Sequence, residues 1–459
     1  MEHKGVIRYM FLFNRERLLV ASPEALSEVL VSKSYDFAKP LATRNMLGPA
    51  LGNGVLLAEG DEHRMQRRRL NPAFHYRHVR GVYSVFWEKA RESVEAMTAA
   101  CNAAGGEAVL LVNSMASRTT LDIIGLAGMG VDFGSIGNEA NALAQTYKKL
   151  MEPSWQSFVV MLLGLWLPSG VLRRLPLRRN RDVMEGAQTI RRVCLDMVRD
   201  KRMLNGRNKN KMGSDDGAKV EAEADILTVA LGSGFSDELL VDQLMTFLAA
   251  GHDTTAAALT WATYLMARHR DKQQRLRDEI RANLAPISAA DGMGSVTCAE
   301  VEGMPYLRAV CNEVLRLFAP VRQTFREAVC DTTIQGLPVR KGTRVVLAPC
   351  ATNVDPRLWG PDAGDFRPER WLSGDGVDAS GGASSNFGFL SFLHGPRSCI
   401  AANFARGELA CLVAAWVGRF DFALADASMA DEANLRFRRT PSAMPLRGMP
   451  LRTRVVEGW

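Results

Sequence analysis

The chain has 459 residues, of which 47% are hydrophobic and 23% are charged. This is ordinary globular composition, so extensive disorder is excluded, and the length permits a large hydrophobic core. The net charge of +7 is spread along the chain without a compact basic stripe, which argues against nucleic-acid binding and leaves an acidic protein partner or anionic lipid equally open.

The N-terminal region shows no secretory signal, because charged residues interrupt it at Glu2, Lys4 and Arg8 and no sustained apolar core follows. Residues 6–13 and 18–21 predict a pair of strands joined by a polar turn at residues 14–17. The sequence Ser22-Pro23-Glu24 then predicts a helix start, with serine as the N-cap and proline in the first turn. From there to about residue 330 helical periodicity dominates.

No apolar stretch reaches the roughly 18–20 residues needed to span a bilayer. The nearest is Phe158–Leu167, which a basic run from Arg173 follows. This pattern predicts either a buried helix followed by a solvated basic tail, or a surface segment that inserts into the membrane interface. Residues 205–223 and 374–386 have the composition of surface insertions, so we expect a single domain over residues 1–459.

A long helix is predicted from Ser236 to about Arg268, and its nearly continuous apolar surface indicates burial through the middle of the molecule. Residues 250–255 read A-G-H-D-T-T and interrupt this surface with polar groups. Burying a carboxylate and two hydroxyls is costly unless they are hydrogen-bonded or used. A structural explanation is equally open, because threonine can bond back to the helix and glycine can permit a bend.

A second helix is predicted over residues 305–318, and Glu313 and Arg316 share one face of it. Taken alone, such a pair is usually a modest surface ion pair. Short strand-like runs follow, with turns at Gln335-Gly336 and Lys341-Gly342.

Eight cysteines form no C-x-x-C pair, and cysteines and histidines do not cluster at zinc spacing, so thiols in a reducing compartment are expected. Residues 392–401 read F-L-H-G-P-R-S-C-I-A and place Cys399 just ahead of a predicted helix. This position stabilises a thiolate, which can be a nucleophile, a redox group or a metal ligand. His394 is a poorly placed base for a nucleophile, whereas a single thiolate suffices to hold a haem iron.

This cysteine segment resembles the F-x-x-G-x-R-x-C-x-G signature of the cytochrome P-450 family. Three other family motifs occur in the family's order: residues 250–255 are similar to A/G-G-x-D/E-T-T, residues 313–316 match E-x-x-R, and residues 366–371 resemble the P-E-R-F segment. The resemblance extends from about Val6 to the C-terminus. It implies a mainly α fold with a smaller β region, a long buried central helix and a cysteine-ligand loop.

The resemblance also implies a role for each matching residue. Cys399 would be the axial ligand of the haem iron, with Phe392 packed beside it. Thr254 would hold a water at the oxygen site while Asp253 relays protons. The remaining roles are a structural triad of Glu313, Arg316 and Arg370, propionate partners at His63, Arg67, Arg326 and Arg397, and a substrate pocket that includes Ala250, Val321, Gln323 and Thr324.

The function that this family implies is oxidation, usually hydroxylation, of an apolar small molecule. It would use haem b, O2 and electrons that NADPH-cytochrome P-450 reductase delivers to a basic proximal face, in a fungal secondary pathway. Two alternatives are haem-thiolate isomerisation or dehydration without O2 activation, and a degenerate haem-binding protein without turnover. The intact Asp253-Thr254 pair argues against the isomerase or dehydratase.

Three departures from the family pattern stand out. Ala401 replaces the last glycine of the cysteine segment, where we expect a small packing change rather than loss of haem. His63 replaces a common tryptophan, and imidazole can still donate a hydrogen bond. The chain also starts almost at the first strand, where eukaryotic members carry a membrane anchor and a first helix. We therefore expect either a shortened chain that belongs at the cytoplasmic face of the endoplasmic reticulum membrane or a cytoplasmic variant.

Overall fold

The structure is a computed structural model that describes residues 2–3, 5–152, 155–156, 159, 163, 171, 175, 177–209, 225–287, 295–374, 376–438 and 442–459. These residues form two compact units. The first comprises Met1–Ala38, Tyr83–Thr119 and Thr254–Trp459, and the second comprises Lys39–Val82 and Thr120–Asp253. Each unit is assembled from separated stretches of sequence, and the single domain stays a prediction.

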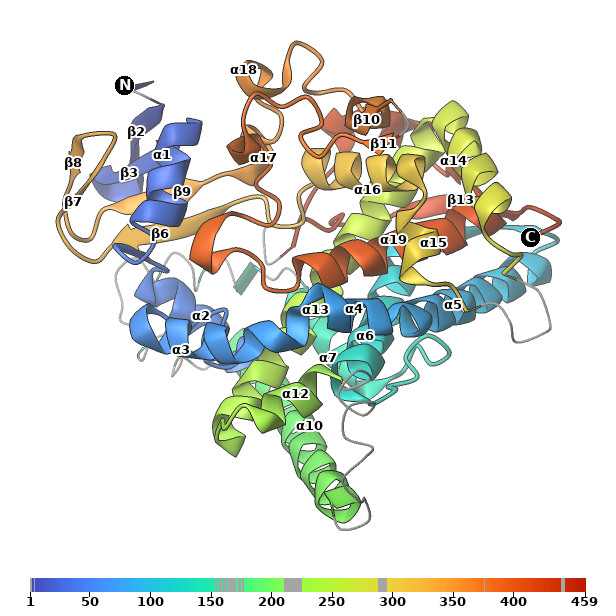
Figure 1. The fold of residues 1–459 in the computed structure, drawn as a ribbon, viewed down its shortest axis with the longest axis horizontal. Coiled ribbons are helices and arrows are strands. Elements are labelled where there is room, and N and C mark those ends of the chain that lie inside the picture. Colours follow the sequence, from blue (N-terminus) through green and yellow to red (C-terminus); the bar gives the residue numbers. More distant parts are fainter. Residues whose placement is uncertain are drawn as a thin grey trace. The chain divides into compact units, whose positions relative to one another are not determined.

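A six-stranded sheet occupies one end of the first unit, in the order β1 (Glu2–His3), β2 (Val6–Phe11), β3 (Arg15–Val20), β9 (Arg344–Leu347), β6 (Thr324–Ala328) and β4 (Phe37–Ala38) (Figure 1). The predicted strand pair is confirmed as antiparallel β2 and β3. The predicted turn is wrong by a few residues. The chain reverses at Leu12–Asn14, where Phe13 and Asn14 take positive φ, and Arg15–Arg17 already belong to β3.

Three smaller sheets complete the β region of the first unit. One has the order β12 (Phe420–Leu424), β13 (Pro450–Val455) and β5 (Glu107–Leu111), and two-stranded sheets join β7 (Thr332–Ile334) to β8 (Leu337–Val339) and β10 (Leu372–Ser373) to β11 (Gly376–Val377). The predicted turns are confirmed, because Gly336 and Gly342 both have positive φ.

The helices of the first unit include α1 (Pro23–Ser27), α5 (Tyr83–Ala103), α14 (Arg270–Asn283), α15 (Cys298–Glu302), α16 (Pro305–Leu317), α17 (Pro349–Thr352), α18 (Pro356–Trp359) and α19 (Ala402–Arg419). Ser22 caps α1 as predicted, accepting a hydrogen bond from the Ala25 amide. Helix α19 is almost wholly buried and packs against α5, α14 and α16. Gly407 permits the close approach to α5, because a Cβ there would lie 2.6 Å from the Tyr83 hydroxyl oxygen.

The regular elements in the described part of the second unit are all helices. It contains α2 (Leu41–Leu51), α3 (Gly60–Leu70), α4 (Tyr76–Gly81), α7 (Ala142–Met151), α10 (Arg178–Lys209) and α12 (Ile226–Gly232). Helix α10 packs against α2 and α7. Helices α6 (Val112–Met129) and α13 (Asp237–Arg268) contribute residues to both units.

The predicted long helix is confirmed as α13, which has its first residue at Asp237 and is continuous through residues 250–255. The Ser236 hydroxyl accepts a hydrogen bond from the Leu239 amide and so satisfies one of the first amide groups of the helix. The described side chains of α13 are mostly buried, including Leu248, Leu259 and Trp261.

The segments predicted as surface features have different outcomes. Residues 210–224, most of Phe158–Leu167, and residues 173, 174 and 176 of the following basic run lie outside the described residues. The later part of that run, from Arg178, forms the start of α10 (Arg178–Lys209). The segment after β10 is less exposed than its composition indicates, because Val377 and Ala383 pack against the cluster around buried Trp371. No described helix is long and apolar enough to cross a membrane.

Candidate active site

The cysteine loop, Phe392–Ala401, is a tight backbone structure that presents Cys399. Gly395 has φ +75°, and a Cβ there would lie 2.2 Å from the carbonyl oxygen of Leu30, so only glycine fits this turn. The amide of Cys399 donates to the carbonyl oxygen of Phe392 at 2.8 Å and closes the loop. The Cys399 side chain is exposed.

Ala401 is the last residue of the cysteine loop and the N-cap residue of α19. Its φ of −97° is open to any L residue. The alanine therefore needs no strained backbone where the family signature has glycine. The start of α19 directs amide groups and the positive end of its dipole toward the loop that carries Cys399.

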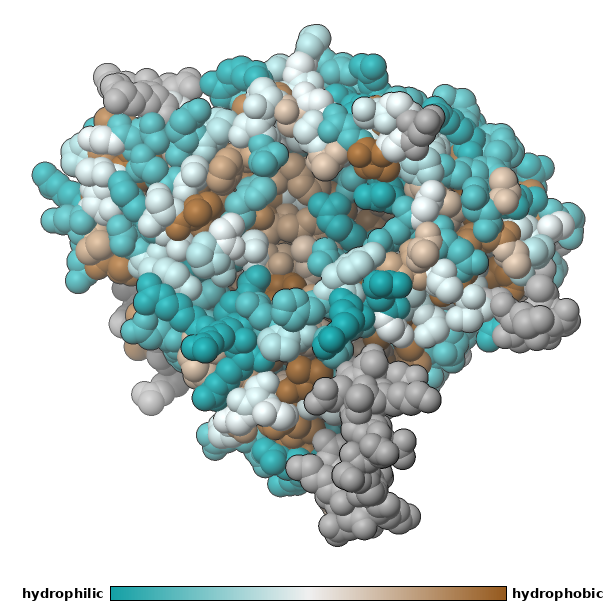
Figure 2. Space-filling model, viewed as in Figure 1, coloured by the Kyte–Doolittle hydropathy of each residue, from teal (hydrophilic) through white to brown (hydrophobic). Residues whose placement is uncertain are grey.

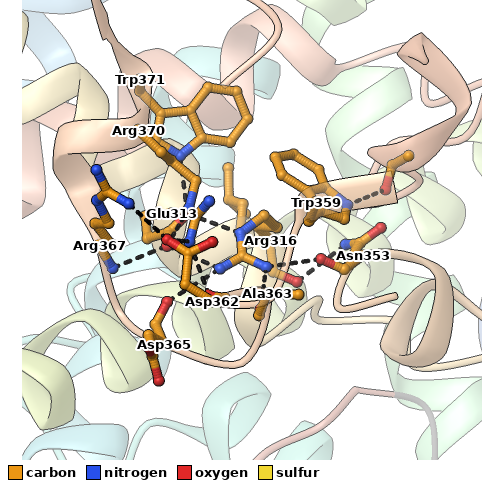
Figure 3. A network of polar contacts seen from close by, with 12 residues as sticks. Glu313, Arg316, Asn353, Trp359, Asp362, Ala363, Asp365, Arg367, Arg370 and Trp371 are labelled. Atoms are coloured by element: carbon orange, nitrogen blue, oxygen red, sulfur yellow. Dashed lines mark hydrogen bonds and ion pairs between the residues drawn. The ribbon is translucent and has the colours of Figure 1, made fainter. Parts of the chain in front are cut away.

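Glu313 and Arg316 are fully buried and lie at the centre of a polar network (Figure 3). Two guanidinium nitrogens of Arg316 donate to the two carboxylate oxygens at 2.8 Å. Arg370 and the indole of Trp371 donate to the same carboxylate at 3.0 and 2.9 Å. A buried carboxylate is tolerated only when its oxygens are satisfied in this way. The structure thus brings Glu313, Arg316 and Arg370 together.

This network continues to the start of the cysteine loop. Arg316 donates to the carbonyl oxygen of Asn353 at 2.8 Å. The Asn353 side chain accepts from the Leu390 amide at 2.8 Å and donates to the Ser391 hydroxyl at 2.9 Å. Leu390 and Ser391 directly precede Phe392, so the buried ion pair holds the backbone that leads into the loop. The sequence did not single out Asn353 or Ser391, and it gave Trp371 only as the last residue of the segment that resembles P-E-R-F.

Two buried arginines, Arg326 and Arg397, lie close to the same strand pair. Arg326 is 3% exposed on β6 and donates to the Thr324 hydroxyl at 3.1 Å, while Arg397 is 8% exposed and donates to the carbonyl oxygen of Phe37 at 2.9 Å. Phe37 pairs with Ala328 in the β4–β6 ladder, two residues beyond Arg326. A buried guanidinium keeps its positive charge and has the geometry to bind a carboxylate.

The polar segment of α13 is buried as the sequence predicts. Asp253 is 3% exposed, Thr255 is 4% exposed, and Thr254 between them is partly exposed. His252 in the second unit packs its ring against Tyr147 at 4.6 Å, and Thr120 donates to the His252 carbonyl oxygen at 2.9 Å.

Glu408 on α19 is a buried carboxyl group that the sequence did not single out. It is 1% exposed and forms a side-chain hydrogen bond with Thr255. Burial raises its pKa well above the ordinary value. Its Oε1 atom has no hydrogen-bond partner among the described residues. A buried carboxyl group with a raised pKa therefore contacts Thr255 of α13 within the first unit.

The other predicted cofactor and substrate residues fall in both units. His63, which is 3% exposed, and Arg67 lie one turn apart on α3 of the second unit. Ala250 also belongs to the second unit. In the first unit Val321 and Gln323 are exposed, and Thr324 is partly buried at the start of β6.

The face drawn in Figure 2 is mainly hydrophilic and is hollowed near its centre. The hollow has hydrophobic residues on its floor and lies in the region of α16, α17 and the cysteine loop (Figures 1 and 2). An apolar hollow with a hydrophilic rim is typical of surfaces that receive a ligand or a transient partner.

Comparison with known proteins identifies the family. The sequence profile of the cytochrome P-450 family matches residues 2–443. The cytochrome P-450 monooxygenase sphH of Aspergillus fumigatus is 46% identical over 460 residues, which cover 99% of this chain and 82% of that protein. The cytochrome P-450 monooxygenase buaD of Petromyces alliaceus is 42% identical over 462 residues, which cover 99% of this chain and 83% of that protein.

The chain belongs to the cytochrome P-450 family. The predicted family and mainly α fold with a smaller β region are confirmed. This cytochrome P-450 is a monooxygenase, an oxidoreductase that incorporates molecular oxygen into a small-molecule substrate and receives electrons from a redox partner. Its cofactor is haem b, with O2 and NADPH-derived electrons as co-substrates.

The residues present fit a haem. An exposed thiol ahead of a helix start is suited to be a thiolate ligand of iron. The buried guanidinium groups of Arg326 and Arg397 are suited to carboxylates such as the two propionates of the cofactor.

Proposed function

We propose that Cys399 would be the thiolate ligand of the haem iron and that Arg326 and Arg397 would bind its propionates. For His63 and Arg67, on α3 of the second unit, we propose a role in binding a carboxylate of the cofactor. When bound, the haem supplies the activation of O2. The exposed thiol of Cys399, on a loop backed by the buried Glu313 network, is the observation that carries this proposal. In this proposal Phe392 packs beside the Cys399 thiolate. Arg370 completes the ion-paired scaffold with Glu313 and Arg316.

We propose that Asp253 and Thr254 deliver protons at the oxygen site. Their adjacent positions on α13 and the burial of Asp253 support this role, because a buried carboxylate beside a hydroxyl can pass a proton along a short path. Ala250, Val321, Gln323 and Thr324 are the residues that we propose to face the substrate. We infer an apolar small molecule of secondary metabolism, consistent with the similarity to fungal monooxygenases.

The test is the spectrum of the reduced holoenzyme with carbon monoxide. Wild-type protein should show the red-shifted Soret band of a thiolate-ligated haem, and Cys399→Ser should lose this band. The matched control is Cys330→Ser, which alters the other exposed cysteine and should keep the band. An imidazole-type spectrum in the wild type, or a full thiolate band in Cys399→Ser, would contradict the proposal.

We propose that electrons arrive from NADPH-cytochrome P-450 reductase, which docks on the face that carries the cysteine loop. The hydrophilic rim around the hollow in Figure 2 supports a transient polar interface there. The net charge of +7 suits an acidic partner surface.

We also propose a peripheral contact with the cytoplasmic face of the endoplasmic reticulum membrane, through the hairpin tip at residues 10–13. This tip has four consecutive exposed apolar side chains: Met10, Phe11, Leu12 and Phe13. The guanidinium carbon of Arg17 lies 3.4 Å from the Phe11 ring centroid, so a cation accompanies the apolar tip. Apolar and aromatic side chains beside arginine suit an anionic phospholipid surface.

Sedimentation with anionic phospholipid vesicles tests this contact. Phe13→Asp should weaken binding by about tenfold or more, since burial of a large apolar side chain contributes roughly 1.5–3 kcal/mol. Val109→Asp is the matched control, because Val109 is an equally exposed apolar residue (59% against 57%) on the separate sheet of β5. Equal binding of Phe13→Asp and the control would refute the contact.

A further inference from the structure

Arg406 on α19 places a cation against the aromatic residue that closes the cysteine loop. Its guanidinium carbon lies 4.8 Å from the ring centroid of Phe392 and 5.5 Å from that of Phe389. The backbone of Phe392 accepts the hydrogen bond from the Cys399 amide. Phe392 therefore connects the two residues: its ring contacts the Arg406 guanidinium, and its carbonyl oxygen binds the Cys399 amide.

The side chain of Arg406 is held in this place. Its Nη1 donates to the side-chain oxygen of Asn312, which precedes Glu313 on α16. Burial lowers the pKa of Arg406, while its electrostatic interactions with Cys311 and Cys399 act in the opposite direction. A guanidinium keeps its charge in proteins, and partial burial reduces the screening of that charge by water.

We propose that Arg406 adjusts the electron donation of Cys399 to the haem iron and so acts as a positioning residue through the thiolate. This inference rests on the proposed role of Cys399 as the iron ligand. A cation near the sulfur stabilises negative charge there. It therefore favours the reduced state of the haem, which carries one more electron, and raises the reduction potential. It also favours the thiolate over the thiol in the apoprotein.

The first test is the reduction potential of the full-length holoenzyme. Arg406→Gln removes the charge and should shift the ferric–ferrous equilibrium about tenfold toward ferric, which is about 59 mV for one electron. Arg406→Lys keeps the charge and should retain most of the wild-type potential. The matched control is Arg275→Gln, which removes another stacked arginine, 4.0 Å from the Tyr306 ring, and should leave the potential unchanged.

The second test needs no haem. In the full-length apoprotein, alkylation of Cys399 by iodoacetamide, followed by peptide mass mapping, reports its thiolate fraction. Arg406→Gln should slow this alkylation by about tenfold, the change that one pKa unit produces. This measurement decides the question even if the variant incorporates little haem.

Two results would overturn the role of Arg406. One is an Arg406→Gln protein that matches wild type in both measurements. The other is an equal shift in the Gln and Lys variants, because the cause would then be lost packing rather than lost charge. A wild-type protein without the thiolate-type carbon monoxide band would instead refute the proposed role of Cys399. The two failures are therefore distinguishable.

Discussion

Thr254 is the partly exposed hydroxyl residue of α13 between buried Asp253 and buried Thr255. If it holds the water that carries protons, Thr254→Ala should leave NADPH oxidation in place while product formation falls by up to about 100-fold, at the lower end of what positioned proton transfer contributes. Hydrogen peroxide should rise correspondingly, as measured per NADPH consumed. Thr254→Ser retains the hydroxyl, so its NADPH oxidation should stay coupled to product formation. If the alanine variant forms as much product per NADPH as wild type, Thr254 has no role in proton delivery.

Glu408 makes the folding stability of the protein depend on pH, and the direction of this dependence follows from its pKa shift. Burial raises the pKa of this carboxyl, so the folded chain keeps the proton at pH values where the unfolded chain releases it. Its contribution to stability is complete below the ordinary glutamate pKa of about 4.3 and is lost as pH rises toward the raised folded-state pKa. Glu408→Gln is neutral at every pH and avoids this loss.

The unfolding free energy of Glu408→Gln minus that of wild type, from denaturant titrations, should therefore increase as pH rises above the ordinary glutamate pKa of about 4.3, with a limiting slope of roughly 1.4 kcal/mol per pH unit for one proton. Glu432→Gln, at an exposed carboxylate, is the control. A flat difference for Glu408→Gln across this range would mean that the carboxyl is ionised in the folded protein.

Individual residues differ in how far the sequence could predict them. Cys399 and the Glu313–Arg316 pair belong to motifs with fixed spacing, so their candidate roles could be stated from the sequence. Glu408 and Arg406 look like ordinary helix charges when α19 is considered alone. Their burial depends on which helices and loops pack around α19, and a linear pattern does not contain that information.

At the scale of elements, the Glu313 network joins α16 to the segment that leads into the cysteine loop. Glu313→Ala leaves Arg316 charged and buried, so it should cost about 3–5 kcal/mol of unfolding free energy and reduce haem incorporation. Arg357→Ala breaks an ion pair whose arginine is 62% exposed and should cost about 1 kcal/mol or less. Denaturant unfolding and haem content measure both; similar costs for the two variants would mean that the network is not a scaffold.

The elements that the sequence predicted best are those whose signals are local. The continuous apolar surface and capping serine of α13 specify a long buried helix. The first hairpin was predicted with its turn at residues 14–17, whereas Phe13 adopts a left-handed conformation that bulky residues rarely take. Residues 374–386 were predicted as surface because glycine and serine give no sign that Trp371 lies beneath them.

At the scale of the whole molecule, pairing between distant strands is what the sequence could not supply. Strand β13 pairs with β5, more than three hundred residues earlier, and β3 pairs in parallel with β9 at a similar separation. Such pairings are set by packing of the complete fold and leave no local periodicity. The two compact units are likewise interleaved in sequence, so no linker composition marks their boundaries.

The net charge of +7 is a property of the entire chain, and it predicts how the redox partner associates. If an acidic reductase surface docks near the cysteine loop, salt should slow the encounter, because the Debye length shortens from about 30 Å at 0.01 M to about 8 Å at 0.15 M ionic strength. The rate of first-electron transfer in stopped-flow mixing should therefore fall over that range by about tenfold or more at subsaturating reductase. Photoreduced deazariboflavin, an uncharged small reductant, is the control and should show little salt dependence. A reductase rate that is unchanged or faster at the higher ionic strength would mean that docking is apolar and that the charge of the chain serves another contact.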